Sequence, residues 1–376
     1  MVKKICLVGG EDVHKRIPLS KYLIDAGYDV TIIGSSTAQF PKNINYVSYN
    51  LNRNFAPFDD YKTLKWYKRF FKNNDFDIIH TFDTKPAFLV PLALRNSNIP
   101  ITRTITGLGI IFNSESFSNF ILRRLYFVFH KIIKKRVSKT IFQNSDNKDL
   151  FLEKNLIYNQ DYEIIYSSGI ELNDIKTRAL RKSDPFTFIC ISRLIYEKGI
   201  INYIEAAKIC RDNGHNYKFL LVGPLEENSN NLNEEILKEN SHVVEWLGQR
   251  NDILNLLAKS DTFVLPTFYG EGFPRVLLEA AAVGLPILST NVTGVREFGE
   301  HQKDFLLIEP KNSKTLAETM IMLANNKQLC EMLAKNAINQ VKEFSLEKIS
   351  NQYITIFDSL IRNSKNENPL FATRHQ

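Results

Sequence analysis

The sequence has few cysteines and no long apolar run, and each shortage disfavours a class of protein. It has no CxxC pair and no histidine at metal-ligand spacing from a cysteine; the four cysteines are Cys6, Cys190, Cys210 and Cys330. This pattern is typical of reduced, buried thiols in a cytosolic protein, and it predicts neither disulfides nor a metal site. No apolar stretch approaches the ~18 residues of a membrane span, and the start MVKKICLVGG is too short in apolar content for a signal peptide.

Two binding signatures are also missing. The first predicted turn reads VGGEDVH where a dinucleotide fingerprint has GxGxxG, which disfavours a nicotinamide dehydrogenase. The net charge of +7 suits nucleic acid, but no zinc-finger spacing or aromatic RNA-binding motif accompanies it. We therefore expect no nucleic-acid partner.

With 376 residues, the chain is long enough for two domains. Short apolar runs alternate with amphipathic stretches in both halves of the chain, and a polar segment separates the two halves. This pattern predicts an α/β fold of two doubly wound, Rossmann-like domains facing each other across a cleft. The expected parts are a first domain at 1–170, a linker at 171–184, a second domain at 185–345, a helix at 346–363 closing back toward the first domain, and a frayed tail from Asn363. The expected strands are Ile5–Val8, Val30–Ile33, Tyr46–Ser48, Ile78–His80, Ile101–Ile105, Thr140–Gln143, Ile164–Tyr166, Phe186–Ile191, Lys218–Val222, Val243–Trp246, Thr262–Leu265 and Ile287–Ser289.

The segment EGFPRVLLE carries the most information. It follows an apolar run that ends at a proline, and it predicts a loop followed by a helix from Pro274 to Val283, with Gly284 as the stop. Free amides and the helix dipole make such a helix start an anion site. Glu271 on the loop then suits sugar hydroxyls beside a phosphate. The plainer alternative is that Glu271 only favours the helix dipole and Glu279 is a solvated helix residue.

Two further features at predicted strand ends suit an anion. Arg193 and Lys198 follow the strand Phe186–Ile191, where a guanidinium and an ammonium can converge on one diphosphate. Gly9-Gly10 follow the first strand. Surface pairing of Lys198 with Glu197 or Glu171 is the alternative; taken together, the three features favour a nucleotide diphosphate.

Positive charge gathers in the first half, where residues 1–168 hold 24 Lys/Arg against 15 Asp/Glu. The excess lies in the segments 62–72 and 123–139, which mix cations with large aromatics at helical spacing. Such faces suit an anionic membrane, with Trp66, Phe70, Phe71 or Phe127 near the acyl boundary. The alternative is two ordinary amphipathic helices with their aromatic sides in the core.

Several motifs, in order, resemble those of retaining GT-B glycosyltransferases of family four. They are SRLIYEKG (192–199), LVG (221–223), LGQR (247–250), FVLP (263–266), EGFPRVLLEAAAVGLP (271–286) and TNVTGVRE (290–297). The first half is similar, more loosely, to enzymes that build bacterial surface glycans, such as capsule and O-antigen, on polyprenyl diphosphate carriers, and especially to N-acetylgalactosaminyltransferases; HKRIP (14–18), DIIH (77–80) and TGLG (106–109) carry this likeness.

The resemblance implies a role for each matching residue. Arg193 and Lys198 would hold the donor diphosphate and Glu271 the sugar hydroxyls. Glu279 would bind the ribose, and Gly10 would approach the phosphates. The stretch from Gly248 to Arg250 would lie against the base, and the amides of Phe273 and of the neighbours of Pro274 would help to cradle phosphate and sugar. Many relatives have a histidine where this chain has Thr106, so its role does not transfer, and His14 or His80 are the candidates.

The implied reaction is metal-independent transfer of a sugar, with retention, from a UDP-sugar to a polyprenyl-diphosphate-linked glycan. Cations and a helix start would stabilise the leaving diphosphate, without a cofactor. The protein would work in the cytoplasm, on the inner face of the membrane. A UDP-sugar 2-epimerase of the same fold and a non-catalytic membrane-associated binding protein are the alternatives.

Overall fold

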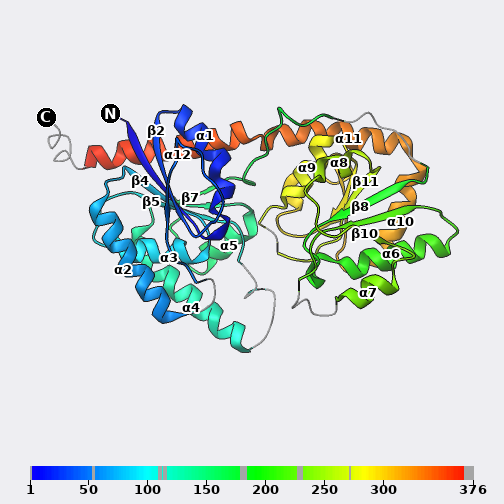
Figure 1. Cartoon of the computed structure of the whole chain (residues 1–376), viewed down its shortest axis with the longest axis horizontal. Helices are drawn as coiled ribbons and strands as arrows, with labels where there is room; N and C mark the ends of the chain where they lie inside the picture. Colours follow the sequence, from blue (N-terminus) through cyan, green and yellow to red (C-terminus); the bar gives the residue numbers. More distant parts are fainter. Residues whose placement is uncertain are drawn as a thin grey trace. The chain divides into compact units, whose positions relative to one another are not determined.

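The structure is a computed structural model that describes residues 2–52, 56–108, 112, 117–177, 184–226, 232–270 and 272–367. The chain forms two compact units, one of Met1–Gly169 with Leu346–Gln376 and one of Ile170–Ser345. Each unit is a parallel sheet covered by helices on both faces (Figure 1).

Unit 1 contains a seven-stranded sheet in the order β3-β2-β1-β4-β5-β6-β7, with every neighbouring pair parallel. Its strands are β1 (Lys3–Val8), β2 (Tyr28–Gly34), β3 (Asn45–Ser48), β4 (Ile78–Thr81), β5 (Ile101–Ile105), β6 (Lys139–Phe142) and β7 (Tyr162–Ile164). Its helices are η1 (Glu11–Arg16), α1 (Ile17–Asp25), α2 (Pro57–Asn73), α3 (Thr84–Ala93), α4 (Phe117–Ile133), η3 (Lys134–Arg136), α5 (Ser145–Glu153) and α12 (Leu346–Glu367), of which η1 and η3 are short 3₁₀ helices.

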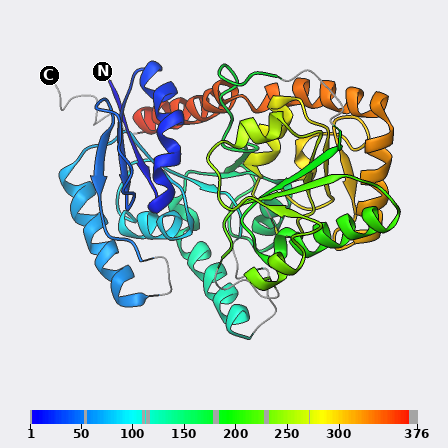
Figure 2. The same cartoon turned by 45° about the vertical axis from the view of Figure 1, so that its right-hand side comes forward.

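Alternate residues of β1 feed two cores in unit 1, because successive side chains of a strand point to opposite faces. Ile5 and Leu7 pack with α1 and α12, and Cys6 and Val8 pack with α2 and α3. Figure 2 shows α1 and α12 on one face of the sheet and α2, α3 and α4 on the other.

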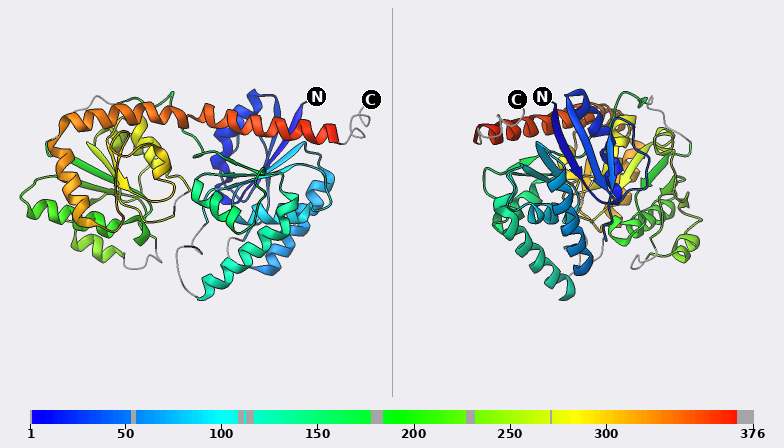
Figure 3. Two further views of the ribbon diagram at one scale, coloured as in Figure 1. Left: turned by 180° about the vertical axis from the view of Figure 1, so that it is seen from behind. Right: turned by 60° about the vertical axis from the view of Figure 1, so that its left-hand side comes forward.

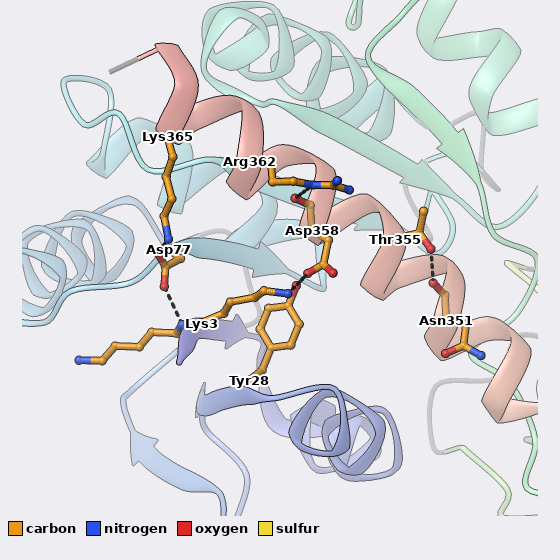
Figure 4. A network of polar contacts seen from close by, with 9 residues as sticks. Lys3, Tyr28, Asp77, Asn351, Thr355, Asp358, Arg362 and Lys365 are labelled. Atoms are coloured by element: carbon orange, nitrogen blue, oxygen red, sulfur yellow. Dashed lines mark hydrogen bonds and ion pairs between the residues drawn. The ribbon is translucent and has the colours of Figure 1, made fainter. Parts of the chain in front are cut away.

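The C-terminal helix α12 completes unit 1. Its apolar stripe fills the core above β1, β2 and β4, and the side chains are Ile349, Tyr353, Phe357 and Ile361. Polar contacts pin its outer side: Asp358 accepts hydrogen bonds from Lys3 Nζ (2.7 Å) and from the Tyr28 hydroxyl, and Lys365 Nζ lies 2.9 Å from Asp77 Oδ1 (Figure 4). Figure 3 shows the helix running along the sheet of unit 1. It continues to Glu367, so the expectation of a frayed tail from Asn363 is wrong for the first five residues.

Unit 2 contains a six-stranded parallel sheet in the order β10-β9-β8-β11-β12-β13. Its strands are β8 (Thr187–Ile191), β9 (Lys218–Val222), β10 (Glu245–Trp246), β11 (Thr262–Leu265), β12 (Ile287–Thr290) and β13 (Leu306–Ile308). Its helices are η4 (Tyr196–Lys198), α6 (Ile200–Asp212), α7 (Glu234–Glu239), α8 (Ile253–Ala258), α9 (Arg275–Val283), η5 (Arg296–Phe298), α10 (Ser313–Asn325), α11 (Lys327–Val341) and η6 (Lys342–Phe344).

The two faces of the second sheet are again covered by different helices. Phe188 and Cys190 of β8 pack with α6 and α10, and Ile189 and Ile191 pack with α9 and α11. The described part of the expected linker packs here too, because Leu172 and Ile175 lie against the core beneath α9. This segment is a packed part of unit 2.

The aromatic residues of the basic segment 62–72 do not face outward as a membrane face requires. Tyr67 and Phe71 are buried, and Trp66 stacks on both Tyr49 and Phe70 with ring centroids 5.1 Å apart in each case. The aromatic side of α2 therefore packs into unit 1, as in an ordinary amphipathic helix. Phe127 of α4 is likewise half-buried against the core beneath that helix.

Candidate functional site

The strand order of unit 2 identifies where a ligand can bind. The chain starts at β8, moves outward through β9 and β10, and then returns to the other side of β8 to form β11. The connections after β8 and after β11 therefore leave the sheet in opposite directions, and the crevice at such a switch point is the usual ligand site of this fold. These two loops carry SRLIYEKG and the segment from Pro266 to Pro274.

The two loops are held together by backbone contacts. The amide of Phe268 donates to the Glu197 carbonyl at 2.8 Å, and the Thr267 hydroxyl donates to the same oxygen at 3.3 Å. Gly199 has a φ of 72°, and a Cβ at this position would lie 2.0 Å from the Pro266 carbonyl oxygen. Only glycine allows this approach, and it brings the Lys198 turn directly beside the end of β11.

Arg193 and Lys198 both lie on the loop after β8, as the sequence predicts, but in different surroundings. Arg193 is half-exposed, with 52% of its side chain accessible, and its Nη1 lies 2.7 Å from Glu226 Oε1 on the loop after β9. Lys198 is only 8% exposed, and its Nζ lies 5.2 Å from the centre of the Tyr269 ring. Lys198 is therefore poorly accessible to water, whereas Arg193 is near water.

Helix α9 begins at Arg275, one residue after the predicted start. Pro274 is the N-cap residue, and Gly284 closes the helix with a φ of 88°. The Phe273 ring packs 5.0 Å from Phe344, which fixes the approach of the loop to the helix. Because α9 follows β11 through this loop, its first amides lie at the carboxyl edge of the sheet, where an anion is favoured. Glu271 lies outside the described residues, and its role remains a prediction.

Glu279 lies in the second turn of α9 and accepts a hydrogen bond from Arg275 Nε at 3.1 Å. Burial raises the pKa of this carboxyl above its usual value, and the positive charge of Arg275 opposes the rise. Its side chain is 21% exposed. A partly desolvated carboxylate that keeps an open side can accept hydrogen bonds from ligand hydroxyls.

Gly248 and Arg250 follow β10, at the edge of the sheet beyond β9. The Gly248 carbonyl accepts from the amide of Gly223 at 2.9 Å, which ties this loop to the loop after β9. Arg250 makes a two-point contact with Asp252, with both N–O distances 2.9 Å. Contact with a base at these residues stays a prediction.

Unit 1 has its own switch point, between β1 and β4. The amide of Gly10 donates a hydrogen bond to Asp83 Oδ2 at 2.7 Å. The amide that was expected to approach phosphate is therefore already hydrogen-bonded to a carboxylate. Asp83 has a φ of 64° and a ψ of 156°, a region that is almost confined to glycine. The sequence analysis missed Asp83, because an aspartate between two predicted elements has no distinguishing spacing.

The two histidine candidates differ in availability. His80 is fully buried, with Nδ1 2.7 Å from the Thr102 hydroxyl and Nε2 2.9 Å from the Thr104 hydroxyl. Both ring nitrogens are used, so His80 is a structural residue and not available to a substrate. His14 is half-exposed on η1, with Nδ1 3.0 Å from the Ser36 hydroxyl, and Thr106 is half-exposed after β5.

The two units identify the fold of the protein. Two doubly wound units, each a parallel sheet between layers of helices, make up the GT-B fold of glycosyltransferases. A glycosyltransferase from Rickettsia africae has this fold with a TM-score of 0.78 and 21% identity, over 96% of this chain and 99% of that one.

Family models identify the class of protein. Residues 173–340 match the model of glycosyl transferases group 1, and residues 4–144 match the glycosyl transferase 4-like model. The chain belongs to these GT-B glycosyltransferases.

Two relatives resemble most of the chain. The N,N'-diacetylbacillosaminyl-diphospho-undecaprenol alpha-1,3-N-acetylgalactosaminyltransferase of Campylobacter jejuni is 28% identical, over 94% of this chain and 97% of its own. The UDP-Gal:alpha-D-GlcNAc-diphosphoundecaprenol alpha-1,3-galactosyltransferase of Escherichia coli is 27% identical, over 81% of this chain and 82% of its own.

Proposed function

We propose that this glycosyltransferase moves an N-acetylhexosamine, such as N-acetylgalactosamine, from a UDP-sugar to a polyprenyl-diphosphate-linked glycan during synthesis of a bacterial surface polysaccharide. The names of the two relatives support the acceptor class, and one of them names a UDP-sugar donor. The observation that carries the proposal is the switch point of unit 2, where the buried Lys198 lies beside the loop that leads from β11 to α9.

The diphosphate of the donor would lie between the loops after β8 and β11. Negative charge builds on it as the bond from the anomeric carbon breaks, and Lys198, Arg193 and the first amides of α9 would stabilise that charge. Glu271 would hold the sugar hydroxyls and Glu279 the ribose hydroxyls. In this scheme the acceptor hydroxyl attacks from the face that the diphosphate leaves, so the anomeric configuration is retained, and its proton passes to the departing phosphate.

Stabilisation by these side chains and amides accounts for a leaving group without a metal ion or a further cofactor. We infer that the protein acts from the cytoplasm at the inner face of an anionic membrane, where a polyprenyl-linked acceptor is anchored. Within the described ranges, no helix is both long and apolar enough to cross a bilayer.

The test is a screen of UDP-sugars against short-chain polyprenyl-diphosphate saccharides, with EDTA in a parallel series. We expect one UDP-N-acetylhexosamine to be consumed only when acceptor is present, with NMR of the product showing the donor's anomeric configuration. Formation of an epimer from UDP-sugar alone would show a 2-epimerase instead. Loss of transfer in EDTA that returns with a divalent cation would contradict the metal-independent scheme.

A further inference from the structure

Helix α4 of unit 1 exposes a continuous apolar stripe. Its large apolar side chains on the outer side recur every three or four residues, so that they share one face of the helix. Phe117 is 78% exposed and Ile132 is 62% exposed. The exposed set is Phe117, Phe120, Ile121, Leu125, Val128 and Ile132.

The opposite side of the same helix is packed against unit 1. Tyr126, His130 and Ile133 are buried, and Phe129 stacks on Phe88 of α3 at 5.5 Å. His130 Nδ1 lies 2.5 Å from Nη1 of the fully buried Arg103 on β5. The helix is therefore held firmly on its inner side, and its outer stripe is additional apolar surface that the core of unit 1 does not use. Figures 1 to 3 show the first turns of α4 extending past the body of the unit.

Positive charge accompanies the stripe and negative charge is absent from it. Residues 117–145 contain seven Lys/Arg and no Asp or Glu. Arg124 and Lys131 are exposed beside the apolar residues, and Arg124 Cζ lies 5.1 Å from the centre of the Phe120 ring. A scattered exposed apolar residue needs no explanation, but a one-sided apolar face on a helix whose own charged residues are all cations is typical of helices that lie in an anionic membrane interface.

We propose that the outer face of α4 (Phe117, Phe120, Ile121, Arg124, Leu125, Val128, Lys131 and Ile132) docks on an anionic lipid bilayer. The apolar stripe enters the boundary between headgroups and acyl chains, and Arg124 and Lys131 contact the anionic headgroups. This rests on the proposed function, because a lipid-linked acceptor places the reaction at a bilayer. It assigns membrane contact to α4 and not to α2, whose aromatic side is packed inside the unit.

Vesicle flotation with paired variants tests the assignment. Arg124→Glu with Lys131→Glu is compared with Lys68→Glu plus Arg69→Glu on α2, which makes the same change of net charge at exposed cations. With vesicles of phosphatidylcholine and phosphatidylglycerol, we expect the α4 pair to weaken partitioning by at least about 30-fold, the loss of two cations at the surface. The α2 pair should change it by less than about fivefold.

A second pair tests the apolar contribution. Val128→Gln with Ile132→Gln should weaken binding by about 10-fold or more, whereas Met322→Gln with Met332→Gln, at exposed positions of unit 2, should not. Circular dichroism melts check that every variant is folded. The proposal is overturned if the α4 pairs bind vesicles as wild type does, or if light scattering shows that the stripe joins two copies of the chain and the α4 pairs only separate them.

Failure of this proposal is distinguishable from failure of the proposed function. Transfer to a short-chain, water-soluble acceptor does not require docking, so the α4 variants should retain it. If wild-type protein floats with vesicles, the α4 pairs lose flotation, and the wild type consumes no donor with any acceptor, the function is wrong and the docking face stands. If transfer proceeds and the α4 substitutions do not change flotation, the docking face is wrong and the function stands.

Discussion

Replacing Lys198 with methionine removes one charge from the switch point and keeps an unbranched side chain. Because Lys198 is 8% exposed, water screens its charge poorly. A unit charge about 4 Å from a phosphate oxygen contributes about 4 kcal/mol at an effective dielectric of about 20. Losing one charge-stabilising group of this kind lowers kcat by about 10²–10³. We expect a loss of that size for Lys198→Met, and a smaller one for Arg193→Met, because Arg193 is 52% exposed and engaged with Glu226.

Steady-state release of UDP with saturating acceptor measures kcat, and calorimetry with UDP measures donor-site affinity. Lys311→Met is the matched control, because Lys311 Nζ lies 4.5 Å from the Phe268 ring on the same side of the sheet but follows β13. That variant should lie within about threefold of wild type. A folded Lys198→Met variant that retains more than about a third of wild-type kcat would show that Lys198 does not stabilise the leaving diphosphate.

Two further substitutions and a change of pH have expected outcomes of known direction. Glu226→Gln frees Arg193 from a half-exposed ion pair, so calorimetry should show UDP binding about twofold to fivefold tighter; weaker binding would place Arg193 outside the donor site. Burial lowers the pKa of His80 and of His130 well below the usual value, so the unfolded chain takes up protons first and the free energy of unfolding should fall as pH drops below about 6.5, by up to about 1.4 kcal/mol per pH unit for each histidine. Urea titrations between pH 7.5 and 5 check this, and stability that rises on acidification would contradict it. Gly223→Ala places a Cβ 1.8 Å from the Ser192 carbonyl oxygen at a φ of 142°, and should lower the unfolding free energy by about 2 kcal/mol or more; an unchanged melting temperature would show that this contact is relaxed.

Most strands and the α9 helix could be predicted from the sequence, because their signals are local. Pro274 and Gly284 lie at the helix boundaries that their backbone preferences favour. The strand β13 was missed, because Leu306–Ile308 is three residues long and follows a polar segment. The strand expected at Ile164–Tyr166 lies instead at Tyr162–Ile164, since it pairs with β6 in a register that the local pattern does not specify.

The direction that a helix faces was harder to predict. Both α2 and α4 mix cations with aromatics, and the helical spacing of these residues alone does not show which face of the helix packs on the sheet. In α2 the aromatic side packs inward, whereas α4 has apolar residues on both sides and can bury only one. The role of His80 was also hidden, because its partners Thr102 and Thr104 are on β5 and come near only through the pairing of β4 with β5.

The connectivity of unit 1 has a consequence for how the protein is made. A ribosome delivers 1–169 first, but the stripe of Ile349, Tyr353, Phe357 and Ile361 that covers one face of its sheet is translated only after all of 170–345. The contiguous second unit can finish folding while the first still has an open apolar face. We expect nascent chains that stop before Leu346 to hold a folded second unit and a first unit that binds chaperones.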